Sequence, residues 1–170
     1  VTGEMRSKAK MVSYGLAYGM EAYGLSQRLG IGVDEAAEIL EAYFAAFPNV
    51  KQYMDEAVET AKKRGYTVTL FGRRRFIPEL NNPNFRIRQI GERQAMNAAI
   101  QGLAADIFKI ALVDIDAKLL ASQTSGRIVL QVHDEVIVEA NKSDAQEVEE
   151  LVLGSMRSAA SLRVPLEINA

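Results

Sequence analysis

Apolar and polar side chains repeat along the first 64 residues with the period of an α-helix. Within residues 35–47, for example, Ala36 and Leu40 fall on one face, opposite two glutamates. Asp34 is a suitable N-cap for that stretch, and Pro48 ends it because proline cannot continue a helix interior. The pattern predicts helices over residues 4–19, 26–29, 35–47 and 49–64.

The pattern changes after Gly65, a residue type that commonly follows the end of a helix. Glycine also weakens a helix interior, so we expect a break near Gly102 in the second long helical region. The later sequence predicts, in chain order, a β-type run at 66–70, a turn at 81–84, a helical region at 85–121, a hairpin at 127–139, a helix from Ser143 to about residue 160 and a final strand at 164–168. Helices early and strands late, with an antiparallel hairpin, predict an α+β fold.

Composition narrows the function classes. The 170 residues form one domain or a piece of a larger one, and the absence of cysteine excludes disulfides and thiolate metal sites. No apolar run approaches the roughly 20 residues of a membrane helix, and no signal peptide opens the chain, so we expect no membrane association and a cytoplasmic location. Residues 51–94 carry ten basic and five acidic side chains, whereas residues 95–170 carry six and eleven. A basic middle is typical of a polyanion-binding stretch, and equally of a solvated helix surface.

Two adjacent acids, Asp134 and Glu135, lie at the tip of the predicted hairpin, between apolar β-type runs. Burying carboxylates together is costly unless a cation compensates their charge. Oxygen ligands suit Mg²⁺, so this tip is the strongest functional candidate in the chain. His133, the single histidine, precedes the acids, and a structural role and a functional role are both open for it.

A second candidate is a stripe of side chains four residues apart on the first predicted helix: Arg6, Lys10, Tyr14 and Tyr18. Two cations followed by aromatic rings can hold a triphosphate at one end and stack a base or sugar at the other. An ordinary amphipathic helix with snorkelling basic side chains has the same spacing, so both interpretations stay open.

Further polar groups follow in the basic segment. Arg73, Arg74 and Arg75 can grip phosphates or form a plain surface charge run. Another stripe with a spacing of four can reach a nucleic-acid minor groove or form a structural polar face, and its members are Arg93, Asn97 and Gln101. The sequence lacks the Gly-x-Ser-x-Gly of hydrolases and the Gly-Lys-Ser/Thr ending of a phosphate loop.

Taken together, these motifs resemble family A DNA polymerases of the bacterial DNA polymerase I type. Arg6 to Gly19 resembles motif B of the fingers, and His133-Asp134-Glu135 resembles motif C. The run Gly72 to Arg75 and the run Asn97 to Asp106 recur in the family in this order. The similarity covers essentially the whole chain. It implies fingers over residues 1–94 and the C-terminal part of the palm over residues 95–170.

The resemblance also implies roles. The parent enzyme would join dNTPs to a primer 3′-OH on a DNA template, in replication or repair, by a two-metal mechanism with two Mg²⁺ ions. Arg6 and Lys10 would bind the triphosphate, Tyr14 would sit against the sugar and Tyr18 would stack near the templating base. Tyr14 stands where many relatives have Phe, which implies poor discrimination against dideoxynucleotides. The remaining roles are Arg73 on the primer side, Arg93, Asn97 and Gln101 in the minor groove, Asp134 as metal ligand with Glu135 assisting, and His133 near the primer end.

Some departures from the family pattern bear on activity. Ala99 and Leu103 replace a common Pro and a common Thr or Ser, which we expect to be tolerated. The motif A strand, with the other metal-binding Asp, is expected upstream of this sequence, so the isolated chain should be inactive. Its unpaired sheet edge should also promote self-association, although the complete enzyme is expected to be a monomer near the bacterial nucleoid. Two alternatives remain: a fragment of a single-subunit RNA polymerase and a noncatalytic nucleic-acid-binding module.

Overall fold

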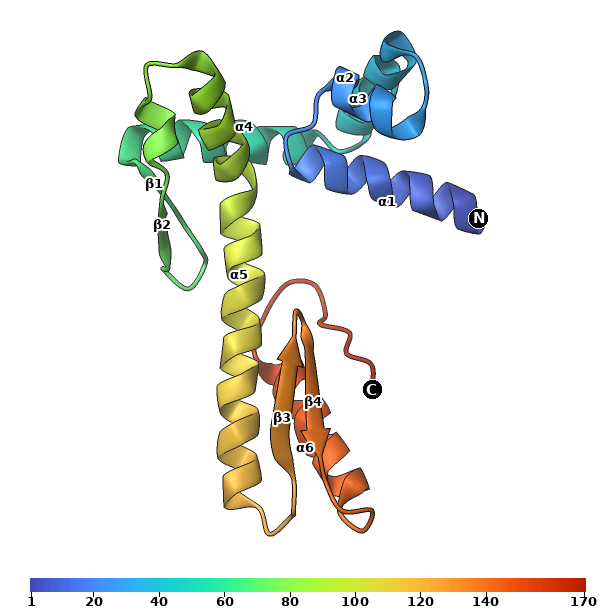
Figure 1. Ribbon diagram of the computed structural model, residues 1–170, viewed down its shortest axis with the longest axis vertical. Coiled ribbons are helices and arrows are strands. Elements are labelled where there is room, and N and C mark those ends of the chain that lie inside the picture. Colours follow the sequence, from blue (N-terminus) through green and yellow to red (C-terminus); the bar gives the residue numbers. More distant parts are fainter. The chain divides into compact units, whose positions relative to one another are not determined.

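The computed structural model describes residues 1–170, apart from the side chain of Ala17. It divides into two compact units, Val1–Gly102 and Leu103–Ala170, each described by itself below. The boundary falls within one long helix, α5, which spans Phe85–Ala121 (Figure 1). None of the described helices is both long and apolar enough to cross a membrane.

The first unit opens with four helices: α1 (Gly3–Ala17), α2 (Ala22–Leu29), α3 (Val33–Ala46) and α4 (Pro48–Arg64). They agree with the predicted helices in number and order, with boundaries that differ by up to four residues. The N-cap of α3 is Gly32 rather than Asp34, which lies inside the first turn as one of its acidic residues. Pro48 ends α3 as predicted and is itself the first residue of α4, because a first-turn position needs no amide hydrogen.

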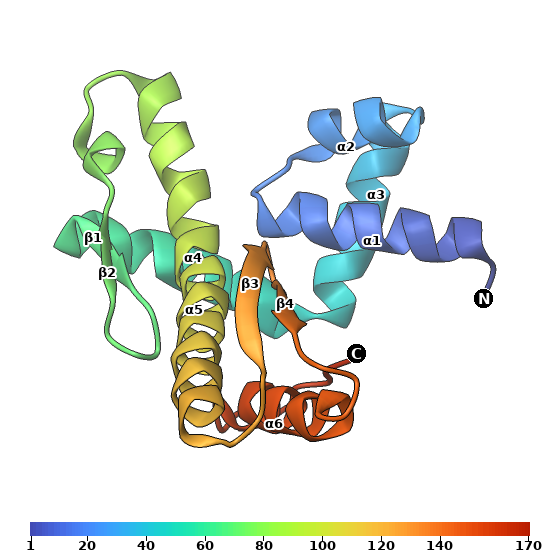
Figure 2. The same ribbon diagram turned by 60° about the horizontal axis from the view of Figure 1, so that its bottom comes forward.

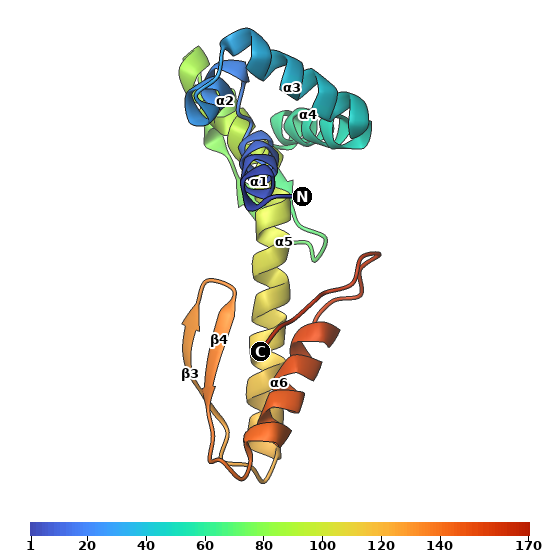
Figure 3. The same ribbon diagram turned by 90° about the vertical axis from the view of Figure 1, so that its right-hand side faces the viewer.

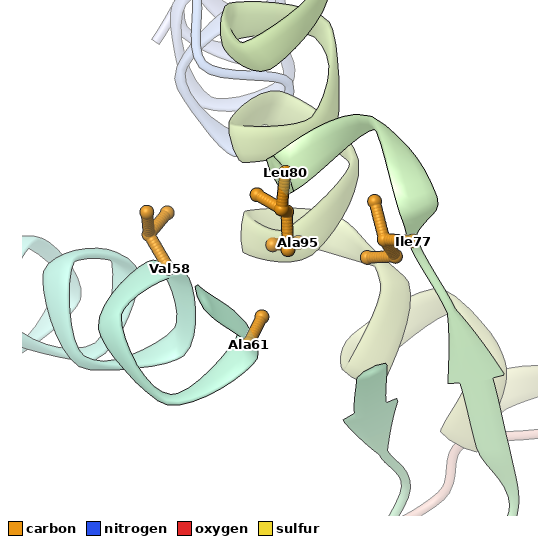
Figure 4. Close-up of a cluster of buried hydrophobic side chains, with 5 residues drawn as sticks. All are labelled: Val58, Ala61, Ile77, Leu80 and Ala95. Atoms are coloured by element: carbon orange, nitrogen blue, oxygen red, sulfur yellow. The ribbon is translucent and has the colours of Figure 1, made fainter. Parts of the chain in front are cut away.

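A small hairpin and a short 3₁₀ helix complete the first unit. Strand β1 (Tyr66–Val68) pairs antiparallel with β2 (Arg74–Phe76), and η1 covers Pro78–Asn81. The core holds side chains from α4, from the segment after β2 and from α5 (Figure 4). Its buried members are Val58, Ala61, Ile77, Leu80 and Ala95. This core packs α4 and the segment after β2 against the N-terminal part of α5.

The second unit contains the C-terminal part of α5, the hairpin of β3 (Arg127–Val132) and β4 (Glu135–Glu139), and α6 (Ala145–Ser158). Ile115 and Leu119 of α5 pack with Val148 of α6 and with apolar residues of both strands. Figure 3 shows the hairpin and α6 beside this part of α5. The α+β fold class is therefore confirmed, and so is the predicted hairpin.

Three sequence expectations are wrong. Helix α5 is continuous through Gly102, because one interior glycine costs only about 1 kcal/mol and the backbone hydrogen bonds continue across it. Residues 164–168 form no strand, since no neighbouring strand pairs with them in the part of the chain that is described. The β3–β4 hairpin packs one face on the core and is not fully buried as expected: Val129 is 49% exposed and Leu130 is 52% exposed.

Candidate functional site

Arg6, Lys10 and Tyr14 of the first predicted stripe lie on α1, as expected, whereas Tyr18 is the C-cap residue just after the helix. Arg6 and Lys10 are exposed, and Tyr14 and Tyr18 are 57% and 52% exposed. The Lys10 ammonium lies 5.6 Å from the centre of the Tyr14 ring, within the range of a cation–π interaction. A positive charge and an aromatic ring therefore sit side by side on the surface of this helix, available to a ligand with an anionic part and a flat part.

The end of α1 contacts α5 within the first unit. The Gln101 amide donates a hydrogen bond to the Tyr18 hydroxyl at 2.7 Å. A Cβ placed on Gly19 would lie 2.8 Å from Cγ of Arg93, so the backbone after α1 touches the Arg93 stem. Asn97 is only 8% exposed, whereas Arg93 and Gln101 are exposed. The fold thus brings Tyr18, Arg93 and Gln101 together, although their positions in the sequence are far apart.

The three arginines of the β1–β2 hairpin differ in their surroundings. Nη2 of Arg73 donates to the backbone carbonyl of Gly102 at 2.7 Å, next to Gln101. The Arg74 guanidinium lies 5.1 Å from the centre of the Tyr66 ring. Arg73 therefore belongs with the Tyr18 and Gln101 group, while Arg74 covers its own strand pair. The sequence run alone gives no basis for this division.

In the second unit, His133 and Asp134 form a two-residue turn between the paired residues Val132 and Glu135. His133 has a φ of 55°, in the left-handed region that costs a side chain with a Cβ about 1–2 kcal/mol. The Gln131 amide donates to the His133 carbonyl at 2.7 Å and supports this turn. Sequence reasoning missed Gln131, although its position two residues before His133 was a usable signal. A strained non-glycine residue at a turn points to a functional constraint on the tip.

The tip residues are exposed, so Asp134 and Glu135 need no cation to compensate a cost of burial, contrary to the sequence-based expectation. Asp134 and Glu135 line one side of a groove of about 690 Å³, which also borders Ile107 and Phe108 of α5 and the C-terminal residues. Their carboxylates match Mg²⁺ by donor type. Among the described residues, no three His, Asp or Glu side chains gather into a metal-binding group. The donors therefore fit as part of a metal site, with further ligands required.

Comparisons with known proteins agree with the motifs. The family model described as DNA polymerase family A matches residues 1–170. DNA polymerase I of Mycobacterium tuberculosis is 50% identical over 169 residues, which cover 99% of this chain and 19% of that protein. DNA polymerase I of Geobacillus stearothermophilus is 48% identical over the same length and coverage. This chain thus spans about a fifth of the length of these curated relatives.

A solved structure is also similar. The POL domain of Pol1 from M. smegmatis, in complex with DNA primer-template and dNTP, superimposes with a TM-score of 0.95 at 47% identity. The match covers 98% of this chain and 30% of that one.

Proposed function

Because this chain belongs to DNA polymerase family A, we propose that it supplies the fingers and the C-terminal part of the palm to a template-directed DNA polymerase. The whole protein would extend a DNA primer with dNTPs, in replication or repair, as a monomer in the bacterial cytoplasm near the nucleoid. The observation that carries the proposal is the family match over all 170 residues. The same match favours a DNA polymerase over a single-subunit RNA polymerase.

We assign the fingers to residues 1–94 and the palm portion to residues 95–170. The division of the structure after Gly102, a few residues beyond this boundary, supports the assignment. The basic excess of residues 51–94 suits an element that lies along a phosphate backbone.

Helix α1 would carry the nucleotide site. Arg6 and Lys10 would bind the triphosphate, since fixed cations stabilise the charge that develops on a leaving pyrophosphate. Tyr14 would lie against the sugar, and the contact between the Lys10 ammonium and the Tyr14 ring supports adjacent phosphate and sugar positions. Tyr18 would stack near the templating base. At a rise of about 1.5 Å per residue, the stripe from Arg6 to Tyr18 extends about 18 Å.

The DNA contacts would come from α5 and the β1–β2 hairpin. Arg93 and Gln101 offer donors at an exposed surface, and Arg73 lies beside them through its bond to the Gly102 carbonyl. Asn97 completes the stripe by spacing, although its side chain is mostly covered. The hydrogen bond between Gln101 and Tyr18 supports a template base placed next to the minor-groove contacts.

Asp134, with Glu135 beside it, would provide oxygen ligands for Mg²⁺, and His133 would lie near the primer end. Mg²⁺ bound there would neutralise phosphate charge and help to align the attacking and leaving oxygens. The described residues supply two adjacent carboxylates and no larger acidic group. We therefore propose that the isolated 170 residues are inactive and that another carboxylate of the longer protein completes the site.

Primer extension tests the proposal. The full-length protein should extend a primer with dNTPs and Mg²⁺, prefer dNTPs to rNTPs, and lose activity with Lys10→Ala or Asp134→Ala. Lys8→Ala is the matched control, because Lys8 lies on the same helix but pairs with Glu4 at 3.0 Å. A noncatalytic binding module would instead bind DNA in a salt-sensitive way that Lys10→Ala and Asp134→Ala leave unchanged.

The isolated chain provides a second test. It should show no extension, and extension that Asp134→Ala abolishes would contradict the missing-carboxylate proposal. It should also elute from gel filtration at a size that rises with concentration, because the exposed apolar residues Val129 and Leu130 lie on a strand with an unpaired edge. A constant monomer size would contradict the proposed self-association.

A further inference from the structure

Helix α1 ends in a compact hydrogen-bonded turn that determines where the next residue lies. Gly19, with a φ of 67°, donates its N–H to the Leu16 carbonyl at 2.7 Å. Met20 donates its N–H to the Gly15 carbonyl at 2.9 Å. This pair of bonds is the Schellman arrangement, in which the residue after the left-handed glycine folds back over the last helical turn. The Met20 side chain is thereby directed at α1 itself.

Met20 fills a slot bounded by one glycine from each of two helices. A Cβ placed on Gly15 of α1 would lie 3.0 Å from the Met20 sulfur. A Cβ placed on Gly24 of α2 would lie 2.8 Å from Cγ of Met20. Both distances are shorter than ordinary contacts between side chains, so the methionine occupies space that exists because neither glycine has a side chain. Figure 2 shows the short connection between α1 and α2 in which Met20 lies.

The other side of the same connection is held by α5. A Cβ placed on Gly19 would lie 3.1 Å from the Met96 sulfur and also close to Arg93. The Gln101 amide donates a hydrogen bond to the Tyr18 hydroxyl. The end of α1 is therefore fixed on two sides, by Met20 toward α2 and by α5 residues opposite. We expect a change in the slot to alter the direction of α1 relative to α2.

We propose that Met20 is a positioning residue, a wedge between Gly15 and Gly24 that sets the direction of α1 relative to α2. It thereby places Lys10 and Tyr14, so the inference rests on the proposed nucleotide site on α1. An unbranched thioether suits this task because it adapts its shape to an irregular gap.

The test is made in the full-length protein with Gly24→Ala. Gly24 is inside α2, where alanine alone would favour the helix. The added Cβ should displace Met20, tilt α1 and raise the KM for dNTP about tenfold, equivalent to 1.4 kcal/mol, with kcat changed less than about twofold. Gly3→Ala, on α1 with no atom within 4 Å of the added Cβ, is the matched control and should change neither constant.

Comparing Gly24→Ala in two backgrounds at position 20 distinguishes a wedge role of Met20 from a general packing defect. In a Met20→Ala background the slot is empty, so adding Gly24→Ala should change the KM less than about twofold. Met20→Leu, which keeps most of the volume, should retain a near wild-type KM. Equal effects of Gly24→Ala in both backgrounds would overturn the proposal.

A structural readout keeps this test separate from the proposed function. Spin labels on cysteines introduced at the exposed positions Lys8 and Arg28 measure the distance between α1 and α2, after replacement of any cysteine elsewhere in the protein. Gly24→Ala should shift the distance distribution, and Gly3→Ala should not. An unshifted distribution, or a shift without a KM change in an active enzyme, would overturn the proposal. A wild-type protein that extends no primer would instead refute the proposed function.

Discussion

Replacing Gly102 by alanine should destabilise the protein, contrary to the usual effect of removing a glycine from a helix. Helix propensity alone predicts a gain of about 1 kcal/mol. However, the added Cβ would lie 2.7 Å from Cγ2 of Thr69, and Thr69 is 8% exposed. Its hydroxyl also accepts the N–H of Arg73 at 3.2 Å, which opposes rotation of the side chain. Overpacking of this kind costs about 1–3 kcal/mol, so the net loss is about 1 kcal/mol.

Urea unfolding of the 170-residue chain, followed by tyrosine fluorescence, measures this loss. The chain has six tyrosines and no tryptophan, and all six lie before residue 67, so the signal reports the first unit. With a slope of about 2 kcal/mol per M, a loss of about 1 kcal/mol lowers the midpoint by about 0.5 M urea. Gly3→Ala, whose added Cβ meets open space, should leave the midpoint unchanged or slightly raised.

The sign of the effect should reverse when the obstructing methyl group is removed. Thr69→Ser keeps the hydroxyl that accepts from Arg73 and deletes Cγ2. In that background Gly102→Ala should raise the midpoint, because only the propensity gain remains. A midpoint that rises with Gly102→Ala in the wild-type background, or falls equally in both backgrounds, would refute the steric argument.

Three further predictions concern the turn, acid stability and sugar selection. His133→Gly should leave the thermal stability, measured by circular dichroism, unchanged or up to about 1 kcal/mol higher, because glycine adopts the positive φ without strain. Primer extension by the full-length protein should fall. A clear loss of stability would contradict this prediction. Hydrogen bonds from the hydroxyl and N–H of Ser125, and from the Ser143 hydroxyl, lower the pKa of Asp144 from 3.8. The stability that these hydrogen bonds contribute is present above about pH 4 and is lost as the pH falls through the lowered pKa. Asp144→Asn should therefore flatten the decline on acidification of the urea midpoint followed by circular dichroism, because the tyrosines report only the first unit. Parallel declines in the two proteins would contradict this. Finally, Tyr14→Phe in the full-length protein should increase discrimination against dideoxynucleotides in a competition assay, and equal discrimination would contradict the poor discrimination expected from Tyr14.

The helices and the hairpin were predictable because their information is local. A period of 3.6 or 2, a proline at 48 and a glycine at 65 specify where elements form and end. The strand expected at 164–168 failed for the complementary reason: β-prone residues form a strand only beside a partner, and none pairs with them in the described chain. The helix break expected at Gly102 is wrong for a similar reason. This glycine is explained by its close contact with Thr69, which lies 33 positions earlier in the sequence.

The same distinction between local and long-range information applies to the candidate site. A spacing of four residues predicts that Arg6, Lys10 and Tyr14 share one face of α1. The hydrogen bond between Tyr18 and Gln101 joins residues 83 positions apart, which no periodicity reveals. Similarly, adjacent acids marked the hairpin tip, whereas the positive φ of His133 depends on the register that pairs Val132 with Glu135.

Four glycines near the faces proposed to hold nucleotide and DNA lie close to neighbouring side chains, and Gly91 lies similarly close to Leu80 and Glu79 of η1. Gly15 and Gly24 leave room for the Met20 side chain. Gly19 lies against the Arg93 side chain, and Gly102 lies against the hairpin that carries Arg73. Glycines at the first turn of α1 and before α3, by contrast, face open space. A polymerase must hold several side chains at fixed positions around one nucleotide, since misplacement of reacting groups by about 1 Å can cost about a hundredfold in rate. Glycines at these positions let neighbouring side chains lie close to the backbone, so substitutions there should affect nucleotide use more than their effect on stability suggests.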